Sequence, residues 1–249
     1  MIGILTKILT ILIFISLLQS QDFRKIDKDL SNSEYQKTII PLQTMNNNYP
    51  KNIQVLTRLS AAYHFLSEQS VDKKLDKLNN IKSLKYITEA MSIDPEHPEV
   101  HKWYAISYGK HVEGQSIRKQ IESSKIIAFH CLQAIEKNPN DPFCYNIMGQ
   151  WHYRLASINP LSRRLASIIF EEPPIGSFEK AEYFLQKSLT LNPDYIGTYY
   201  WLGKTYDKLK MSDKKISLFN TAVNLKRPYK REKVIYEEIK KELKKLKHL

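Results

Sequence analysis

Two histidines, His97 and His101, stand four residues apart, a spacing at which one helix face can present two ligands to a metal ion. Pro98 lies between them, and neither a third ligand nor an HExxH order follows. We therefore interpret His97 as a loop residue and His101 as a residue packed on a helix face. The chain has no phosphate-binding loop, nucleophile elbow or CxxC pair. We expect no catalytic activity, no cofactor and no metal site.

Long cationic and amide side chains at helical spacing are the stronger candidates for chemistry. Such groups donate charge-assisted hydrogen bonds to carboxylates, so a row of them can hold an extended acidic peptide. Aromatic residues such as Phe143 and Tyr153 flank the row. The alternative interpretation is a solvated helix face that needs no ligand. The row comprises Lys102, Asn146, Gln150, Arg154, Tyr200, Lys204 and Lys208.

These side chains share a surface only if repeated helical hairpins position them. The segment from Asn192 to Pro228 follows the tetratricopeptide (TPR) signature of about 34 residues, with Tyr199 in place of Trp and Lys215 in place of Ala. Residues three and four apart lie above one another on a helix, and Gly203 lets the partner helix approach. A hairpin this small cannot bury its apolar stripes alone, so it predicts neighbours. The matching residues are Tyr199, Leu202, Gly203, Tyr206, Phe219 and Ala222.

The template recurs three times towards the N-terminus. Its closing prolines, Pro95, Pro139 and Pro193, are 44 and 54 residues apart, so the middle units carry about ten and twenty extra residues. We expect a loop over 109–124, an extra helix over 161–170 packed on the array, and a Lys-rich insertion over 71–80. The matching residues are Leu56, Leu59, Ser60 and Tyr63 with Ser83, Ile87 and Ala90; His101, Tyr104, Ala105 and Tyr108 with Ile127, Cys131 and Ala134; and Tyr145, Met148, Gly149 and His152 with Ala181, Leu185 and Ser188.

The pattern predicts an all-α fold, a TPR-like α-solenoid of about four helix pairs over residues 52–228 with a basic capping helix over 229–249. Ile235, Ile239, Leu243 and Leu246 make the apolar stripe of that helix. Residues 226–249 hold ten Lys or Arg and four Glu, half of the formal charge of +12. This charge suits an acidic filament, an anionic bilayer or nucleic acid, whereas the alternatives are a solubilising cap and a biased codon usage. We expect no nucleic-acid partner.

The N-terminal residues 1–20 predict a signal peptide or a membrane anchor. The apolar run from Ile8 to Leu18 has eleven residues, fewer than the ~20 that span a bilayer. Residues 21–51 read as a polar linker with one helical turn near residues 33–40. Cys131 and Cys144 look half-buried and form no disulfide framework, and the chain has no glycosylation sequon. Both observations suit a cytosol-facing domain and leave a lumenal one open.

The two irregular stretches, 97–124 and 138–174, resemble the regulator of microtubule dynamics family. The matching features are His-x-Trp at residues 101–103 after Pro-Glu, the Ser-Ile-x-Lys-x-Ile run at 116–121, Gly-x-Trp at 149–151 and Glu-x-Pro-Pro at 171–174. The resemblance covers roughly residues 52–246. It is more specific than the TPR signature alone, because the odd-length insertions match in place and in residues.

The resemblance implies a TPR-like helical domain without catalysis that associates with microtubules and spindle poles. Some members carry an N-terminal anchor for mitochondria or endoplasmic reticulum, and their helical domain binds phospholipid at organelle contacts. We therefore predict a microtubule-associated adaptor of the cytoplasm or cytoskeleton, whose basic surfaces meet acidic tubulin. One alternative is a phospholipid-binding or transfer module with an apolar cavity beside residues 161–170. Another is a lumenal or secreted TPR scaffold, if residues 1–20 are cleaved.

Overall fold

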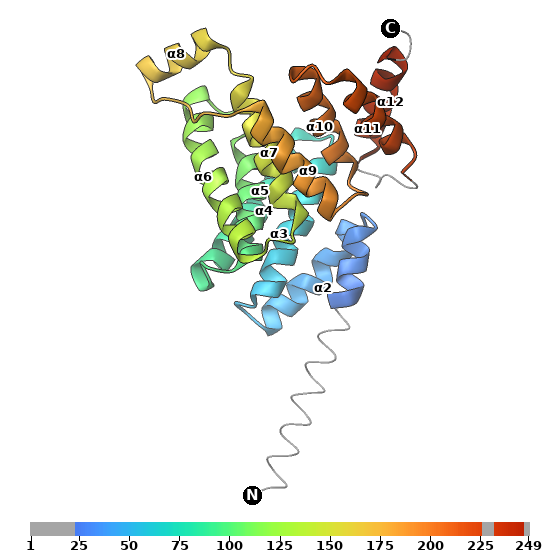
Figure 1. Cartoon of the computed structure of the whole chain (residues 1–249). Helices are drawn as coiled ribbons and strands as arrows, with labels where there is room; N and C mark the ends of the chain where they lie inside the picture. Colours follow the sequence, from blue (N-terminus) through green and yellow to red (C-terminus); the bar gives the residue numbers. More distant parts are fainter. Residues whose placement is uncertain (1–22, 226–231, 247–249) are drawn as a thin grey trace, which may run out of the picture.

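The computed structural model describes residues 23–225 and 232–246, and all regular structure in these ranges is helical. A helical stretch over residues 23–31 precedes the labelled helices, which, apart from α8, stack side by side into one array (Figure 1). They are α2 (Tyr35–Asn48), α3 (Ile53–Gln69), α4 (Lys73–Ile93), α5 (Pro98–Val112), α6 (Ile117–Lys137), α7 (Pro142–Ala156), α8 (Pro160–Ile169), α9 (Phe178–Leu191), α10 (Ile196–Lys208), α11 (Ser212–Val223) and α12 (Lys233–Leu246).

Four helix pairs form the body of the array: α3 with α4, α5 with α6, α7 with α9, and α10 with α11. These pairs are the four predicted repeats, so the TPR-like solenoid is confirmed. At the C-terminal end, α12 packs on α10 and α11 and buries Ile239 and Leu243 against Phe219. The predicted capping helix is therefore present over its described residues.

In two of the four pairs, a glycine allows the two helices to approach each other closely. A Cβ atom at Gly149 of α7 would overlap Leu185 of α9, and one at Gly203 of α10 would overlap the ring of Phe219 on α11. Both glycines stand at the Gly position of the repeat signature. A side chain there would push the partner helix away, which explains why the signature needs glycine at these two positions.

The predicted loop over 109–124 is wrong. Helix α5 continues to Val112 and α6 begins at Ile117, so only four residues connect them. Val112 and Ile121 are buried, and the apolar contacts that they make favour longer helices over a loop. The Lys-rich insertion over 71–80 likewise belongs mostly to α4, which is 21 residues long, as is α6.

The predicted extra helix over 161–170 exists as α8, but its predicted packing on the array is wrong. Ala166 is its one buried residue, whereas Leu161 is 69% exposed and Ile168 is 71% exposed. The helix projects from the array (Figure 1). Arg163 holds its base, because its guanidinium donates hydrogen bonds to the carbonyls of Leu155 at 2.9 Å and Pro173 at 2.7 Å.

The predicted linker over residues 21–51 is also wrong within the described range. Residues 23–31 are helical and α2 follows, with Pro41 inside it. Ile39 and Leu42 pack against Val55 and Leu59 of α3, so this segment adds to the hydrophobic core. The burial of these few apolar residues stabilises a helix, although the polar composition of the segment favours a loop. The array therefore begins earlier than predicted.

Residues 1–20, predicted as a signal peptide or anchor, lie outside the described residues. Within the ranges that are described, no helix combines the length and apolar character that a membrane crossing requires. Cys131 and Cys144 are fully buried rather than half-buried, and both thiols are free. A hydrogen bond with Cys144, together with burial, raises the pKa of the Cys131 thiol, which keeps it in the unreactive protonated form.

Candidate binding surface on the first helices

The first helices of the pairs lie next to one another, with α3 against α5 and α7 against α10. The predicted row of seven residues comes from three of these helices. Lys102 is on α5; Asn146, Gln150 and Arg154 are on α7; and Tyr200, Lys204 and Lys208 are on α10. The structure divides the row into two parts with different surroundings.

Lys102 is a buried ion-pair partner rather than a free groove cation. Its side chain is 9% exposed, and its Nζ lies 2.6 Å from Glu99 Oε1 and 2.6 Å from Asp141 Oδ2. Asp141 also caps α7, because its carboxylate accepts from the amide of Phe143 at 2.8 Å. Burial disfavours the charged lysine, but the two carboxylates outweigh it and raise the pKa of Lys102. Lys102 therefore joins α5 to the start of α7, and two carboxylates already neutralise its charge.

Asn146 and Gln150 form a second internal network. The Asn146 amide donates to Thr198 Oγ1 at 3.0 Å, and the hydroxyl of Thr198 also lies 3.2 Å from that of Ser188. Gln150 donates to Asn146 Oδ1 at 2.7 Å. Asn146, Thr198 and Ser188 are buried, so this network ties α7 to α9 and α10. These two amides serve the packing of the array.

Of the other four residues of the row, Arg154, Tyr200 and Lys204 lie against Trp201, which sequence reasoning did not select. The guanidinium carbon of Arg154 lies 5.3 Å from the Trp201 ring centroid, and Lys204 Nζ lies 5.5 Å from it. These distances are in the range of cation–π attraction. Lys208 is exposed one helical turn beyond Lys204. We call the group of Tyr153, Arg154, Tyr200, Trp201, Lys204 and Lys208 the Trp201 cluster.

The aromatic rings of the cluster are held in place by each other. Tyr153 meets Trp201 edge to face at 5.5 Å and Phe178 at 5.6 Å. Trp201 could have been found from the sequence, because Lys204 and Lys208 follow it by three and seven residues on one helix face. The approach of Arg154 and Tyr153 from α7 has no such local signal.

The carboxylates near the Trp201 cluster are already engaged. Lys215 Nζ lies 2.6 Å from Asp207 and 2.7 Å from Glu242, and its side chain is 6% exposed. Burial and the nearby Glu238, which is hydrogen-bonded to Tyr200, raise the pKa of Tyr200 to about 12. Among the described residues, Arg154, Lys204 and Lys208 consequently take part in no ion pair with a carboxylate. Arg154, Lys204 and Lys208 can therefore take a carboxylate of a ligand as their ion-pair partner.

The two histidines at metal-ligand spacing have separate roles. His97 caps α5, since its Nδ1 accepts from the amide of Glu99 at 3.2 Å. His101 is buried, and its Nδ1 lies 2.8 Å from Nδ1 of His130 on α6. Across residues 23–225 and 232–246, no group of three or more His, Cys, Asp or Glu is arranged to hold a metal ion.

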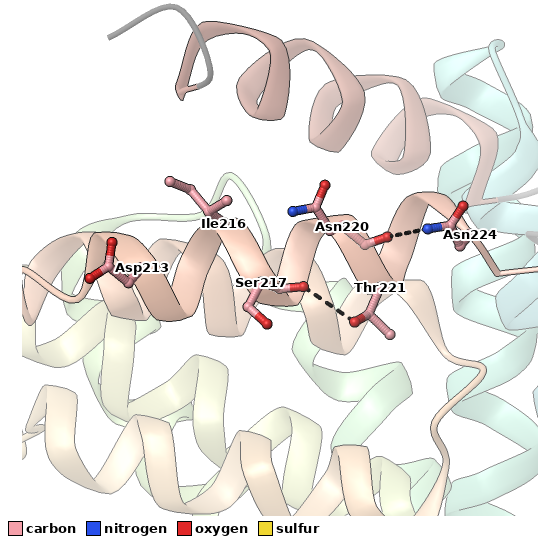
Figure 2. A pocket seen from close by; sticks show the side chains of 6 residues that line it. All are labelled: Asp213, Ile216, Ser217, Asn220, Thr221 and Asn224. Carbon is pink, nitrogen blue, oxygen red and sulfur yellow. Dashed lines mark hydrogen bonds between the residues drawn. The ribbon is translucent and has the colours of Figure 1, made fainter.

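Two surface depressions offer no enclosed ligand site. One of about 450 Å³ runs along α11, and all six residues that line it come from that helix and the residue after it (Figure 2). Its hydrogen bonds, such as Asn224 to the Asn220 carbonyl at 2.8 Å, stay within this segment. The second, of about 240 Å³, lies between the end of α8 and α6, where Arg118, Glu122 and Glu171 contribute to its lining. It is not the apolar cavity that a phospholipid carrier would need beside residues 161–170.

Comparisons with known proteins agree with the fold and identify the family. The family model described as Regulator of microtubule dynamics protein 1-3 matches residues 22–247. Regulator of microtubule dynamics protein 1 of Homo sapiens is 33% identical over 165 residues, which are 66% of this chain and 51% of that protein. Regulator of microtubule dynamics protein 3 of Xenopus laevis is 28% identical over 147 residues, 59% of this chain and 32% of that protein. The chain thus spans about half the length of the curated protein 1 relatives it matches.

Among solved structures, a thermophilic TPR protein of Thermus thermophilus superimposes with a TM-score of 0.62. The match covers 88% of this chain and 97% of that chain, at 13% sequence identity. A likeness at this identity shows the fold and not the function. It agrees with the TPR-like solenoid described above.

Proposed function

Because the chain belongs to the regulator of microtubule dynamics family, we propose that it is a non-enzymatic adaptor that associates with microtubules. The observation that carries this proposal is the Trp201 cluster, in which Arg154 and Lys204 lie over the ring of Trp201 without a carboxylate partner and Lys208 is exposed one turn further along α10. Tubulin presents an acidic surface and acidic tails, so its carboxylates are the complementary groups. Lys102, Asn146 and Gln150, which make internal contacts in the array, take no part in the proposed contact with tubulin.

The terminal helix α12 carries exposed lysines at its end, whereas its Glu238 and Glu242 face Tyr200 and Lys215. It packs on α10, and its last turn carries Lys244 and Lys245, both exposed. An acidic segment that lies across Trp201 would therefore meet further cations at the C-terminal end of the array. Exposed charges of this kind steer and strengthen association more at low salt than at high salt.

The experiment is microtubule co-sedimentation of the full chain at increasing salt. We expect Lys204→Glu with Lys208→Glu to weaken microtubule binding about tenfold or more at low salt. Two negative charges that repel acidic tubulin would then replace two positive charges that attract it. The matched control is Lys180→Glu with Lys187→Glu on α9, which changes the same number of exposed charges. Affinity that ignored salt, or that fell equally in both variants, would contradict the proposed surface.

We further propose that the helical array faces the cytosol, with attachment to a mitochondrial or endoplasmic reticulum membrane through residues 1–20. Protease digestion of a C-terminal tag in intact organelles distinguishes this arrangement from a lumenal one. A tag that is digested without detergent on a full-length chain supports the proposal. A protected tag on a chain shortened by about twenty residues would instead favour a lumenal scaffold with another ligand.

A further inference from the structure

The outer side of α4 is both basic and apolar. Leu75, Leu78 and Ile81 are 51%, 46% and 45% exposed, although aliphatic side chains of this size favour burial. Because they are spaced by three residues, they follow one another along one side of the helix. Three exposed lysines stand among and beside them. We call this surface the α4 outer face: Lys74, Leu75, Lys77, Leu78, Ile81 and Lys85.

Asp76 and the N-cap residue Asp72 at the start of α4 are turned away from this face, whereas Glu89 lies on it one turn beyond Lys85. Asp76 accepts a hydrogen bond from Ser67 of α3 and lies 3.8 Å from Lys110 of α5. Asp72 caps the helix, where its carboxylate accepts from the amide of Lys74 at 2.7 Å. Within the described part of the chain, Lys74, Lys77 and Lys85 consequently pair with no carboxylate. The three lysines outnumber Glu89, so the α4 outer face keeps a net positive charge.

The opposite side of α4 explains why these residues stay exposed. Ser83 and Ile87 face inward, where Ser83 donates to the Ser60 carbonyl at 2.8 Å and Ile87 packs against Leu56. Their inward direction rotates Leu78 and Lys85 outward, since these positions lie about half a turn away. The exposure therefore follows from how α4 is seated on α3 and α5.

The combination of charges and aliphatic groups selects the kind of partner. An acidic polypeptide would be held by the lysines alone, and a nucleic acid would favour arginine and stacking aromatic groups, which this face does not offer. At an anionic bilayer, Leu and Ile enter the boundary of the acyl chains while the lysine stems extend to the headgroups. We propose that the α4 outer face docks on a lipid bilayer that contains anionic headgroups.

The experiment compares vesicle flotation of the full chain with phosphatidylcholine alone and with added phosphatidylserine. The readout is the gain in binding that phosphatidylserine produces, because residues 1–20 are common to all variants. We expect Lys74→Glu with Lys85→Glu to reduce this gain about tenfold, since each basic residue near an anionic leaflet contributes to affinity. The α9 control, Lys180→Glu with Lys187→Glu, should keep it.

A second variant tests the aliphatic groups. Leu78→Ser with Ile81→Ser leaves every charge in place and should reduce binding to the phosphatidylserine vesicles several-fold, because it removes apolar area that enters the boundary. Circular dichroism and thermal unfolding of each variant show whether the array is intact. Microtubule co-sedimentation with the same variants separates this surface from the Trp201 cluster.

Three results would overturn the proposal. The first is an undiminished phosphatidylserine gain in Lys74→Glu with Lys85→Glu. The second is an equal loss in that variant and in the α9 control, which would reflect total charge only. The third is full vesicle binding of Leu78→Ser with Ile81→Ser, which would show that the aliphatic groups of the face do not enter the bilayer.

Discussion

Lys102 and Lys204 lie on the first helices of two repeats, α5 and α10, yet their surroundings differ. Lys102 is buried between Glu99 and Asp141, whereas Lys204 lies over the rings of Tyr200 and Trp201. Asp141 is available to Lys102 because it caps the next first helix, α7. Near Lys204, the carboxylates of Asp207 and Glu242 are taken by Lys215. The residue type alone does not make a binding group, because neighbouring helices decide whether its charge is already neutralised.

The largest expected difference between the two lysines is in stability. Lys102→Met should lower the free energy of unfolding by about 3 kcal/mol, because it leaves the carboxylate of Asp141 largely buried without its cation. Lys204→Met, the matched control, should change it by less than about 0.5 kcal/mol. Urea unfolding of both variants measures the difference. Similar values for the two would contradict the division of the row.

The amide network should show an intermediate effect. Asn146→Ala removes the donor to Thr198 and the acceptor of Gln150, and should lower the free energy of unfolding by about 1–2 kcal/mol. Gln150→Ala is the control, since Gln150 is only half-buried and its loss leaves the contact with Thr198 intact. Chemical unfolding provides the comparison. A larger loss for Gln150→Ala would show that Asn146 is not the centre of the network.

A smaller effect on stability, which depends on pH, concerns α7, the helix that carries Asn146, Gln150 and Arg154. His152 of α7 is buried against Phe184 of α9, and burial, with a contribution from Lys180, lowers the pKa of His152 to about 4. The unfolded chain then binds the proton more readily, so stability is retained above pH ~6.5 and is lost as pH falls towards 4. Urea midpoints at pH 7 and pH 5 measure this loss. In His152→Phe the difference between the two midpoints should shrink, and an unchanged difference would assign the loss to other groups.

The smallest expected effect on stability belongs to the exposed half. Lys204→Glu with Lys208→Glu should change the free energy of unfolding by about 1 kcal/mol or less, because Lys208 forms no ion pair in the described part of the array and Lys204 loses only its cation–π contacts with Tyr200 and Trp201. The same variant is expected to lose microtubule binding, so function and stability separate here. Thermal unfolding checks the first point. A marked drop in the midpoint of thermal unfolding would show that these lysines stabilise the array.

The repeats could be predicted because their signature is local. Gly203, Leu202 and Tyr206 are set on one helix face by spacing alone, and the burial of Leu202 and Tyr206 follows. The odd insertion lengths also carried the family resemblance. Lys215 departs from the signature, and no local pattern explains it. Its partners Asp207 and Glu242 belong to α10 and α12, so its role appears only when three helices are assembled.

By itself the sequence determined the helical hairpins, their order and the capping helix, because residues three and four apart share a face in any helix. The tertiary structure decided what each polar side chain does, since Asp141 reaches Lys102 and Arg154 reaches Trp201 only across helix boundaries. It also decided that residues 23–48 join the core and that α8 stands away from it. Burial depends on the surfaces that neighbouring helices leave open, and those surfaces are formed by residues far apart in the chain.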